Sequence, residues 1–143
     1  MGIEMEESSQ NLQEVNVVAT PFRKTAESPL GLRVIGFKEI EKSAGGNRDI
    51  SRVVQSFPGV ASTAAFRNDI IVRGGGPSEN RFFLDGVEIP NINHFSTQGA
   101  SGGPVGIINP DFIREVNFYA AAFPAARGNA LSSVLDFKLQ DGN

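Results

Sequence analysis

The fold is decided by residues 70–89, which read IIVRGGGPSENRFFLDGVEI. β-branched and aromatic residues fill both ends of this stretch, and such residues favour strands. The Asp85-Gly86 pair stands between two apolar runs, which is a strong short-range signal of a β-hairpin, and Pro90 closes the hairpin. We therefore predict a strand at 70–73, which runs into the glycine-rich segment 74–77, and a hairpin at 81–89.

Shorter elements precede this stretch. Residues 32–36 predict a second strand, and residues 37–41 carry apolar side chains at a spacing of three, which suits one or two helical turns. The clearest helix follows, with Asn47 as its cap, Asp49 in its first turn and Pro58-Gly59 as its end. Its core face is predicted from apolar residues at i, i+3, i+4 and i+7, namely Ile50, Val53, Val54 and Phe57.

Two more strands are predicted near the C-terminus. Asn109-Pro110-Asp111 has the residues of a helix start and leads into an apolar strand at 112–118. Residues 135–139 alternate between apolar and polar side chains, which predicts a half-buried strand with Asp136 and Lys138 on its polar face. The elements follow no regular βαβ repeat. We predict an α+β fold, a small mixed β-sheet with short helices packed on it and long loops.

Composition limits the possible functions. The chain has 143 residues, which suggests one domain, and its 13 Lys and Arg against 16 Asp and Glu give a formal charge of -3. Without a basic excess, nucleic acid is not expected as a partner. The absence of Cys excludes disulfides and thiolate metal sites. Residues 1–7 lack the cationic start and apolar stretch of a secretion signal, so the chain is either cytosolic or a mature fragment with a new start.

The sequence predicts that a tail and a strand-competent segment with its linker precede the folded domain. Residues 1–13 are mostly acidic and polar and are expected to form a flexible tail, either native or introduced by cloning. Residues 14–19 are rich in valine and end before Thr20-Pro21, so they form a strand or a strand-competent peptide, followed by a linker to residue 26. We place the folded domain at 27–143. Within it, residues 91–106 have almost no apolar period and predict a long functional or mobile loop.

Catalytic motifs are weak. Gly99-Ala100-Ser101-Gly102-Gly103 fits the G-x-S-x-G nucleophile elbow and looks like the nucleophile segment of chymotrypsin-like serine proteases. However, the only histidine, His94, lies in the same loop, and the flanking strand and helix of the elbow are missing. A serine hydrolase using Ser101 is therefore a remote alternative. The glycine run 74–76 lacks the residues of a phosphate-binding motif, and the acidic residues lack metal-binding spacing. We predict no catalytic residue, metal or cofactor.

Several motifs together resemble a known family. Residues 14–20 resemble a TonB box, and Phe57-Pro58-Gly59-Val60, Ile71-Val72-Arg73-Gly74, Leu84-Asp85-Gly86-Val87 and Ile113-Arg114-Glu115-Val116 follow in the order and spacing seen in the plug domain of TonB-dependent outer-membrane receptors. The chain departs from the family's usual pattern at Tyr119-Ala120-Ala121-Ala122, where arginine-glycine-proline is common. It departs again at Leu131-Ser132-Ser133-Val134, where a double glycine is common. The resemblance covers residues 14–143.

The resemblance implies a role for each part of the chain. The plug gates a 22-stranded outer-membrane barrel, which needs more than about 200 residues in strands and is not contained in this chain. Its N-terminus faces the periplasm, where the C-terminal domain of TonB pulls on the box. Partners are then TonB, the receptor's own barrel, and a substrate such as a siderophore, cobalamin or glycan. A free-standing ligand-binding module is the alternative.

The resemblance also assigns candidate site residues. The TonB-binding set comprises Glu14, Val15, Asn16, Val17, Val18 and Ala19. The substrate-facing set lies in three loops and comprises Phe66, Arg67, Asn68, Pro77, Ser78, Glu79, Asn91, Asn93, His94 and Phe95. Arg73 and Arg127 resemble arginines that pair with barrel carboxylates, and without a barrel their charges are expected to lie in solvent.

Overall fold

The computed structural model describes residues 31–43, 49–62, 67–100 and 102–142. Its elements, in chain order, are β1 (Leu32–Gly36), α1 (Phe37–Lys42), α2 (Ile50–Gln55), β2 (Val60–Ser62), β3 (Ile70–Val72), the 3-10 helix η1 (Pro77–Glu79), β4 (Arg81–Leu84), β5 (Val87–Ile89), β6 (Asn93–His94), β7 (Val105–Gly106), the 3-10 helix η2 (Pro110–Phe112), β8 (Ile113–Tyr119) and β9 (Val134–Leu139).

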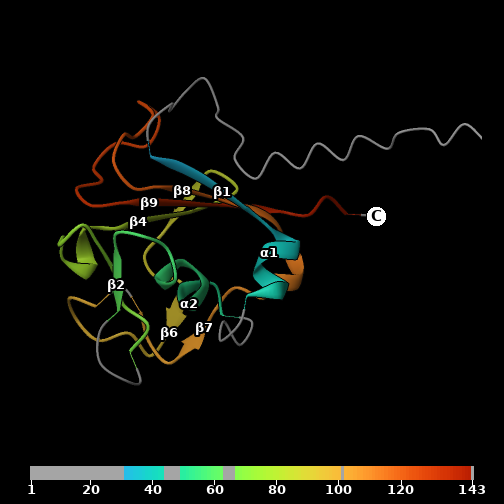
Figure 1. Cartoon of the computed structure of the whole chain (residues 1–143), viewed down its shortest axis with the longest axis horizontal. Coiled ribbons are helices and arrows are strands. Elements are labelled where there is room, and N and C mark those ends of the chain that lie inside the picture. Colours follow the sequence, from blue (N-terminus) through green and yellow to red (C-terminus); the bar gives the residue numbers. More distant parts are fainter. Residues whose placement is uncertain (1–30, 44–48, 63–66, 101, 143) are drawn as a thin grey trace, which may run out of the picture.

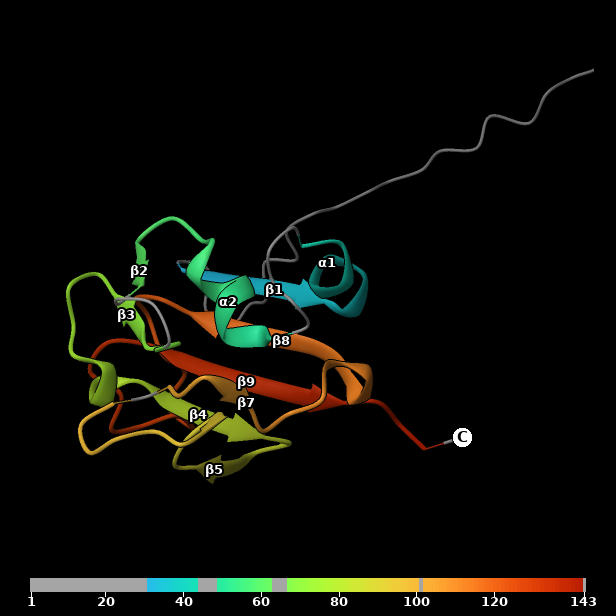
Figure 2. The same cartoon turned by 90° about the horizontal axis from the view of Figure 1, so that it is seen from below.

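A five-stranded mixed sheet forms the centre of the domain, with the strand order β1-β8-β9-β4-β5 (Figure 2). β9 is the middle strand and runs parallel to β4, whereas the other neighbours in this sheet are antiparallel. Two small antiparallel pairs, β2-β3 and β6-β7, stand beside it. The small mixed sheet with short helices confirms the predicted α+β class.

One face of the sheet carries the main hydrophobic core. α2 and the β6-β7 pair lie on the same side of the sheet (Figure 1). Because successive strand residues point to opposite faces, Phe82, Phe118 and Phe137 all reach this side and meet the apolar face of α2. That helical face is the predicted one, since Ile50, Val53, Val54 and Phe57 are all buried.

The opposite face of the sheet holds a smaller cluster. Phe83, Tyr119 and Val134 are buried there, with Leu32, Phe123 and Ala130 packed against them. Asp136 lies on this face too, directly opposite Phe83 in the register of β4 and β9. The sequence predicted a solvent-facing side chain at this position, and this is wrong: Asp136 is only 4% exposed.

Turn chemistry explains the hairpin. Asp85 and Gly86 both have positive φ, at 47° and 89°, which is the conformation that a two-residue hairpin turn requires. An Asp-Gly pair adopts it at little cost, because aspartate tolerates the left-handed region and glycine has no Cβ. The predicted hairpin at 81–89 is confirmed as β4 and β5.

Two local expectations need correction. Asp49, predicted inside the first turn of α2, is itself the N-cap and accepts a hydrogen bond from the Ser51 amide. Asn47, the predicted cap, lies outside the described residues. The long segment 91–106 is not irregular throughout, because Asn93 and His94 pair with Val105 and Gly106 as β6 and β7. None of the helices formed by the described residues is long and apolar enough to cross a bilayer.

Candidate functional site

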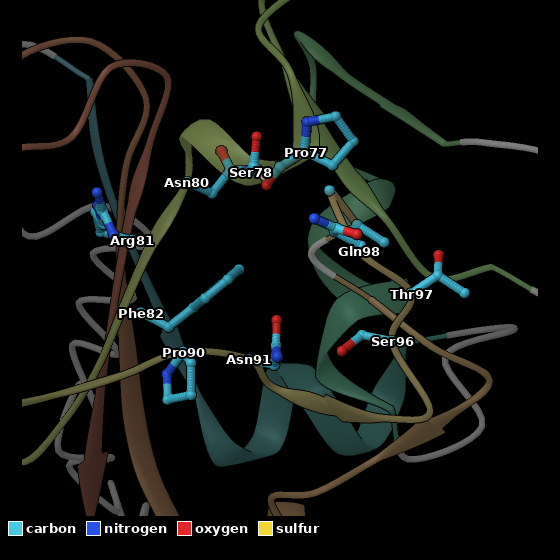
Figure 3. Close-up of a pocket in the computed structure, with 12 residues that line it drawn as sticks. Pro77, Ser78, Asn80, Arg81, Phe82, Pro90, Asn91, Ser96, Thr97 and Gln98 are labelled. Atoms are coloured by element: carbon cyan, nitrogen blue, oxygen red, sulfur yellow. Dashed lines mark hydrogen bonds between the residues drawn. The ribbon is translucent and has the colours of Figure 1, made fainter.

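A polar pocket of about 360 Å³ lies between three segments of the chain (Figure 3). Its walls come from residues within 77–82, from Pro90 and Asn91, and from residues 96–100. In Figure 3, Asn91 and Phe82 point toward the middle of the pocket. The pocket therefore joins Pro77, Ser78 and Asn91, which the sequence placed in two separate substrate-facing loops.

The carboxylate of Asp49 fixes the long loop to the start of α2. Its Oδ2 accepts hydrogen bonds from Asn68 Nδ2 at 2.9 Å and Asn93 Nδ2 at 3.4 Å, and its Oδ1 accepts from the Ser51 amide at 2.9 Å. Asn93 also donates to the Gly103 carbonyl at 2.9 Å. Asn68 and Asn93 are only 5% and 2% exposed, so these amides support the loops from within.

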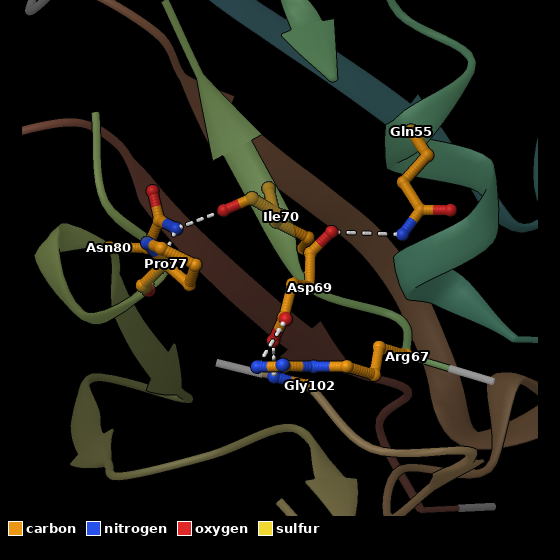
Figure 4. A network of polar contacts seen from close by, with 7 residues as sticks. All are labelled: Gln55, Arg67, Asp69, Ile70, Pro77, Asn80 and Gly102. Carbon is orange, nitrogen blue, oxygen red and sulfur yellow. Dashed lines mark hydrogen bonds and ion pairs between the residues drawn. The ribbon is translucent and has the colours of Figure 1, made fainter. Parts of the chain in front are cut away.

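Asp69 ties the same loop at a second point (Figure 4). Its buried carboxylate accepts a hydrogen bond from the Gly102 amide at 3.0 Å and forms an ion pair with Arg67 at 3.0 Å. Its carbonyl accepts from Gln55 Nε2, on α2, at 3.0 Å. The pocket-lining segment 96–100 therefore lies between two anchored points, Asn93 and Gly102.

Glycine is required where the loop meets its neighbours. A Cβ on Gly102 would collide with the backbone of Asn68 and Asp69, and one on Gly103 would collide with the carbonyl of His94. Backbone atoms cannot move aside as the end of a side chain can. The two glycines permit the close approach that the hydrogen bonds of Asp69 and Asn93 stabilise.

Asn80 is a pocket residue at the end of a loop that the sequence predicted to face the substrate. It is 5% exposed, and its Nδ2 donates to the carbonyls of Ile70 and Pro77, while its Oδ1 accepts from Ser133 Oγ at 2.6 Å. Its hydrogen-bonding groups are thus engaged inside the domain. It shapes the pocket by joining η1 and β3 to the start of β9.

The other predicted substrate-facing residues occupy varied positions. Arg67 is half exposed and pairs with Asp69, while His94 and Phe95 are exposed with their rings 6.0 Å apart. Glu79 lies on η1 beside Gly75 and Gly76. Phe66, Ser101 and the TonB-binding set lie outside the described residues. The pocket adds Ser96, Thr97 and Gln98, whose only sequence signal was a run of neutral polar residues in the long loop.

The two predicted barrel-contact arginines differ. Arg73 is exposed, has an unusual φ of 50° and forms no ion pair with the described part of the chain. Arg127 does not lie in solvent as expected: it pairs with Asp136 Oδ2 at 2.9 Å, and its guanidinium stacks 4.6 Å from the Phe83 ring centroid. The sequence expectation for Arg127 is wrong because it overlooked a carboxylate within the domain.

Truncating Asn68 tests the anchor of the loop. In Asn68→Ala, Asp49 loses one charge-assisted hydrogen bond, so we expect the free energy of unfolding to fall by about 1.5–3 kcal/mol. Amide hydrogen exchange at 92–103 should accelerate more than exchange in β8 and β9. Gln98→Ala, which removes an exposed amide, is the matched control and should change stability by less than about 0.5 kcal/mol. Equal effects of the two variants would contradict the anchoring role.

Among residues 31–43, 49–62, 67–100 and 102–142, no group of three or more His, Asp or Glu side chains is placed to hold a metal ion. His94 is exposed and lies on β6, which pairs with β7. The arrangement offers a ligand-sized polar pocket, supported by the half-buried carboxylate of Asp49 and the buried carboxylate of Asp69.

The solved structures that resemble this fold include siderophore receptors and an outer membrane transporter. The siderophore receptor PirA from Pseudomonas aeruginosa matches with a TM-score of 0.59 and 20% identity over 80% of this chain and 19% of its own. The outer membrane transporter YddB from Escherichia coli matches with a TM-score of 0.61 and 21% identity, over 79% of this chain and 17% of its own. The siderophore receptor PirA from Acinetobacter baumannii matches with a TM-score of 0.59 and 22% identity, over 80% of this chain and 18% of its own. The chain thus spans less than a fifth of the length of each of these receptors and transporters.

These neighbours show the fold, and a match to a family model shows that the domain is a receptor plug. The family model described as the TonB-dependent receptor plug domain matches residues 24–134. The chain belongs to this family, as its motifs indicated. No curated protein matches the sequence.

Proposed function

We propose that the chain gates a barrel in the TonB-dependent, energy-coupled uptake of a substrate such as a siderophore, cobalamin or glycan. The match to the plug family over residues 24–134 is the observation that carries this proposal. In it, residues 27–143 fill the lumen of a 22-stranded barrel in the outer membrane, residues 14–26 form the TonB-binding segment and linker, and residues 1–13 are a tail facing the periplasm.

The loops and the exposed arginine have distinct roles in this proposal. The pocket between 77–82 and 96–100 faces the substrate, and the anchors at Asp49 and Asp69 keep its walls in place. Arg73 pairs with a carboxylate of the barrel. Its exposed side chain and left-handed backbone support this role, because residues held in rare backbone conformations often serve a partner or ligand.

The TonB-binding segment is expected to add as a strand to the sheet edge of its partner. Titration of the labelled chain with the TonB C-terminal domain should shift the amide signals of residues 15–19, because main-chain hydrogen bonds provide the affinity in such pairing. Val17→Pro removes an amide donor and should weaken binding about tenfold or more. Ser8→Pro, in the tail, is the control and should bind normally. Unchanged spectra with the cognate partner would contradict this role.

The size and compartment of the native polypeptide test the proposal as a whole. An antibody raised against the chain should detect a band several times 15.3 kDa in the outer-membrane fraction of the source cells. A soluble band near 15.3 kDa would overturn the proposal and favour a free-standing ligand-binding module that uses the same pocket.

A further inference from the structure

The pocket presents polar side chains that the domain itself does not use. Ser78, Asn91, Ser96, Thr97 and Gln98 line it, and their side chains make no hydrogen bond to the described part of the chain. All five are neutral. Three hydroxyls and two amides together offer both donors and acceptors to whatever enters.

The one charged residue in the pocket wall is directed elsewhere. Arg81 forms an ion pair with Glu88 at 3.2 Å, and its Nε donates to the Asn129 carbonyl at 3.2 Å. It precedes Phe82 on β4, so the two side chains point to opposite faces of the sheet. Since Phe82 faces the pocket, the guanidinium of Arg81 lies on the other face, and the pocket contains no uncommitted charge.

We propose that the pocket binds a neutral, polyhydroxylated group such as a sugar unit. The inference rests on the proposed function and names its substrate class. A hydroxyl both donates and accepts hydrogen bonds, so a polyol can satisfy serine, threonine, asparagine and glutamine side chains in any combination. An anionic group, by contrast, would lose its hydration here without gaining a cation.

The remaining walls suit the same kind of ligand. Pro77 and Pro90 supply rigid apolar surface, which can cover the C–H faces of a sugar ring while the polar groups bind its edges. Asn80 is saturated by internal hydrogen bonds and holds the wall in shape. A volume of about 360 Å³ is at the small end for ligand pockets, so it suits one unit of a larger molecule.

Titrations of the isotope-labelled chain with two kinds of probe test this inference. The neutral probes are maltotriose, cellotriose, N,N'-diacetylchitobiose and mannotriose, and the anionic probe is ferric citrate at the same ionic strength. We expect at least one neutral saccharide to shift the amide signals of residues 77–80 and 96–100 in a saturable manner. Ferric citrate should leave these signals unchanged.

Paired variants locate the site. Asn91→Ala should weaken saccharide binding about fivefold or more, as expected for the loss of one hydrogen bond. Asn109→Ala removes an asparagine that caps η2 outside the pocket and should bind as the unmodified chain does. Equal binding by both variants would overturn the assignment of the site.

The outcomes separate this inference from the proposed function. Saturable shifts at 77–80 and 96–100 with ferric citrate would overturn the neutral-ligand inference and leave the plug proposal intact. Silence with every probe would likewise overturn it, while TonB binding and the size of the native polypeptide would still decide the plug proposal independently.

Discussion

Replacing Phe137 with alanine is expected to lower the free energy of unfolding by about 3–5 kcal/mol, the range for large-to-small changes at buried aromatic residues. Phe137 is fully buried on the middle strand of the sheet and belongs to the main core cluster. Its removal leaves a cavity bounded on two sides by paired strands, β8 and β4, which cannot move inward without breaking their hydrogen bonds. The total free energy of unfolding of a small domain is only about 5–15 kcal/mol, so this substitution removes much of the stability.

Phe112 provides the matched control for this cavity. Its side chain is 65% exposed on η2, so Phe112→Ala removes the same atoms without opening the core. We expect the free energy of unfolding, measured by chemical denaturation, to change by less than about 0.5 kcal/mol. A similar loss of stability in both variants would contradict the placement of Phe137 in the core.

The second large effect is expected from Arg127→Ala. This change leaves the carboxylate of Asp136 buried, with Lys138 Nζ at 3.6 Å as its remaining cation. Asp136 Oδ1 already has no hydrogen-bond partner in the described structure. Breaking a buried ion pair costs roughly 3–5 kcal/mol, and the nearby lysine places the expected loss at the lower end of that range.

A double-mutant cycle separates the ion pair from the loss of packing. Because Asp136→Asn removes the buried charge, adding it to Arg127→Ala should restore part of the stability, with a coupling energy of about 1–3 kcal/mol. The control is the exposed ion pair between Arg114 and Asp141, whose atoms are 3.0 Å apart. Its coupling energy should be about 0–1 kcal/mol. A coupling at Arg127 no larger than at Arg114 would show that burial does not strengthen the pair.

Local sequence signals predicted most elements but not their assembly. Apolar spacing identified β1, α1, α2 and β3, and the Asp-Gly turn identified the hairpin, because these features depend on residues close together in the chain. β2 has three residues and no signal of its own beyond Val60. The parallel pairing of β4 with β9 joins segments separated by the long loop and β8, and local patterns carry no information about it.

The candidate site was less accessible to sequence reasoning. The loops that line the pocket could be located, but their anchors could not, since the sequence predicted only a helix-start role for Asp49 and gave no local signal for Asp69. Arg127 and Asp136 show the same difficulty. Alternation predicted a solvent-facing aspartate, while in the structure the segment between β8 and β9 brings an arginine over that position. Burial of a charge depends on which distant segment covers it.

The order of strands along the chain also governs when the domain can form. β9 is the middle strand of the sheet but the last of these strands in chain order, and β1, the first, can pair only once β8 is present. Pairing such distant strands requires ordering much of the chain before new contacts offset the lost conformational entropy, and this slows folding. Until residue 139 is available, β4 and β8 keep open edges, and a chain stopped before Val134 retains them permanently. We therefore expect the growing polypeptide to be prone to aggregation while these edges are unpaired.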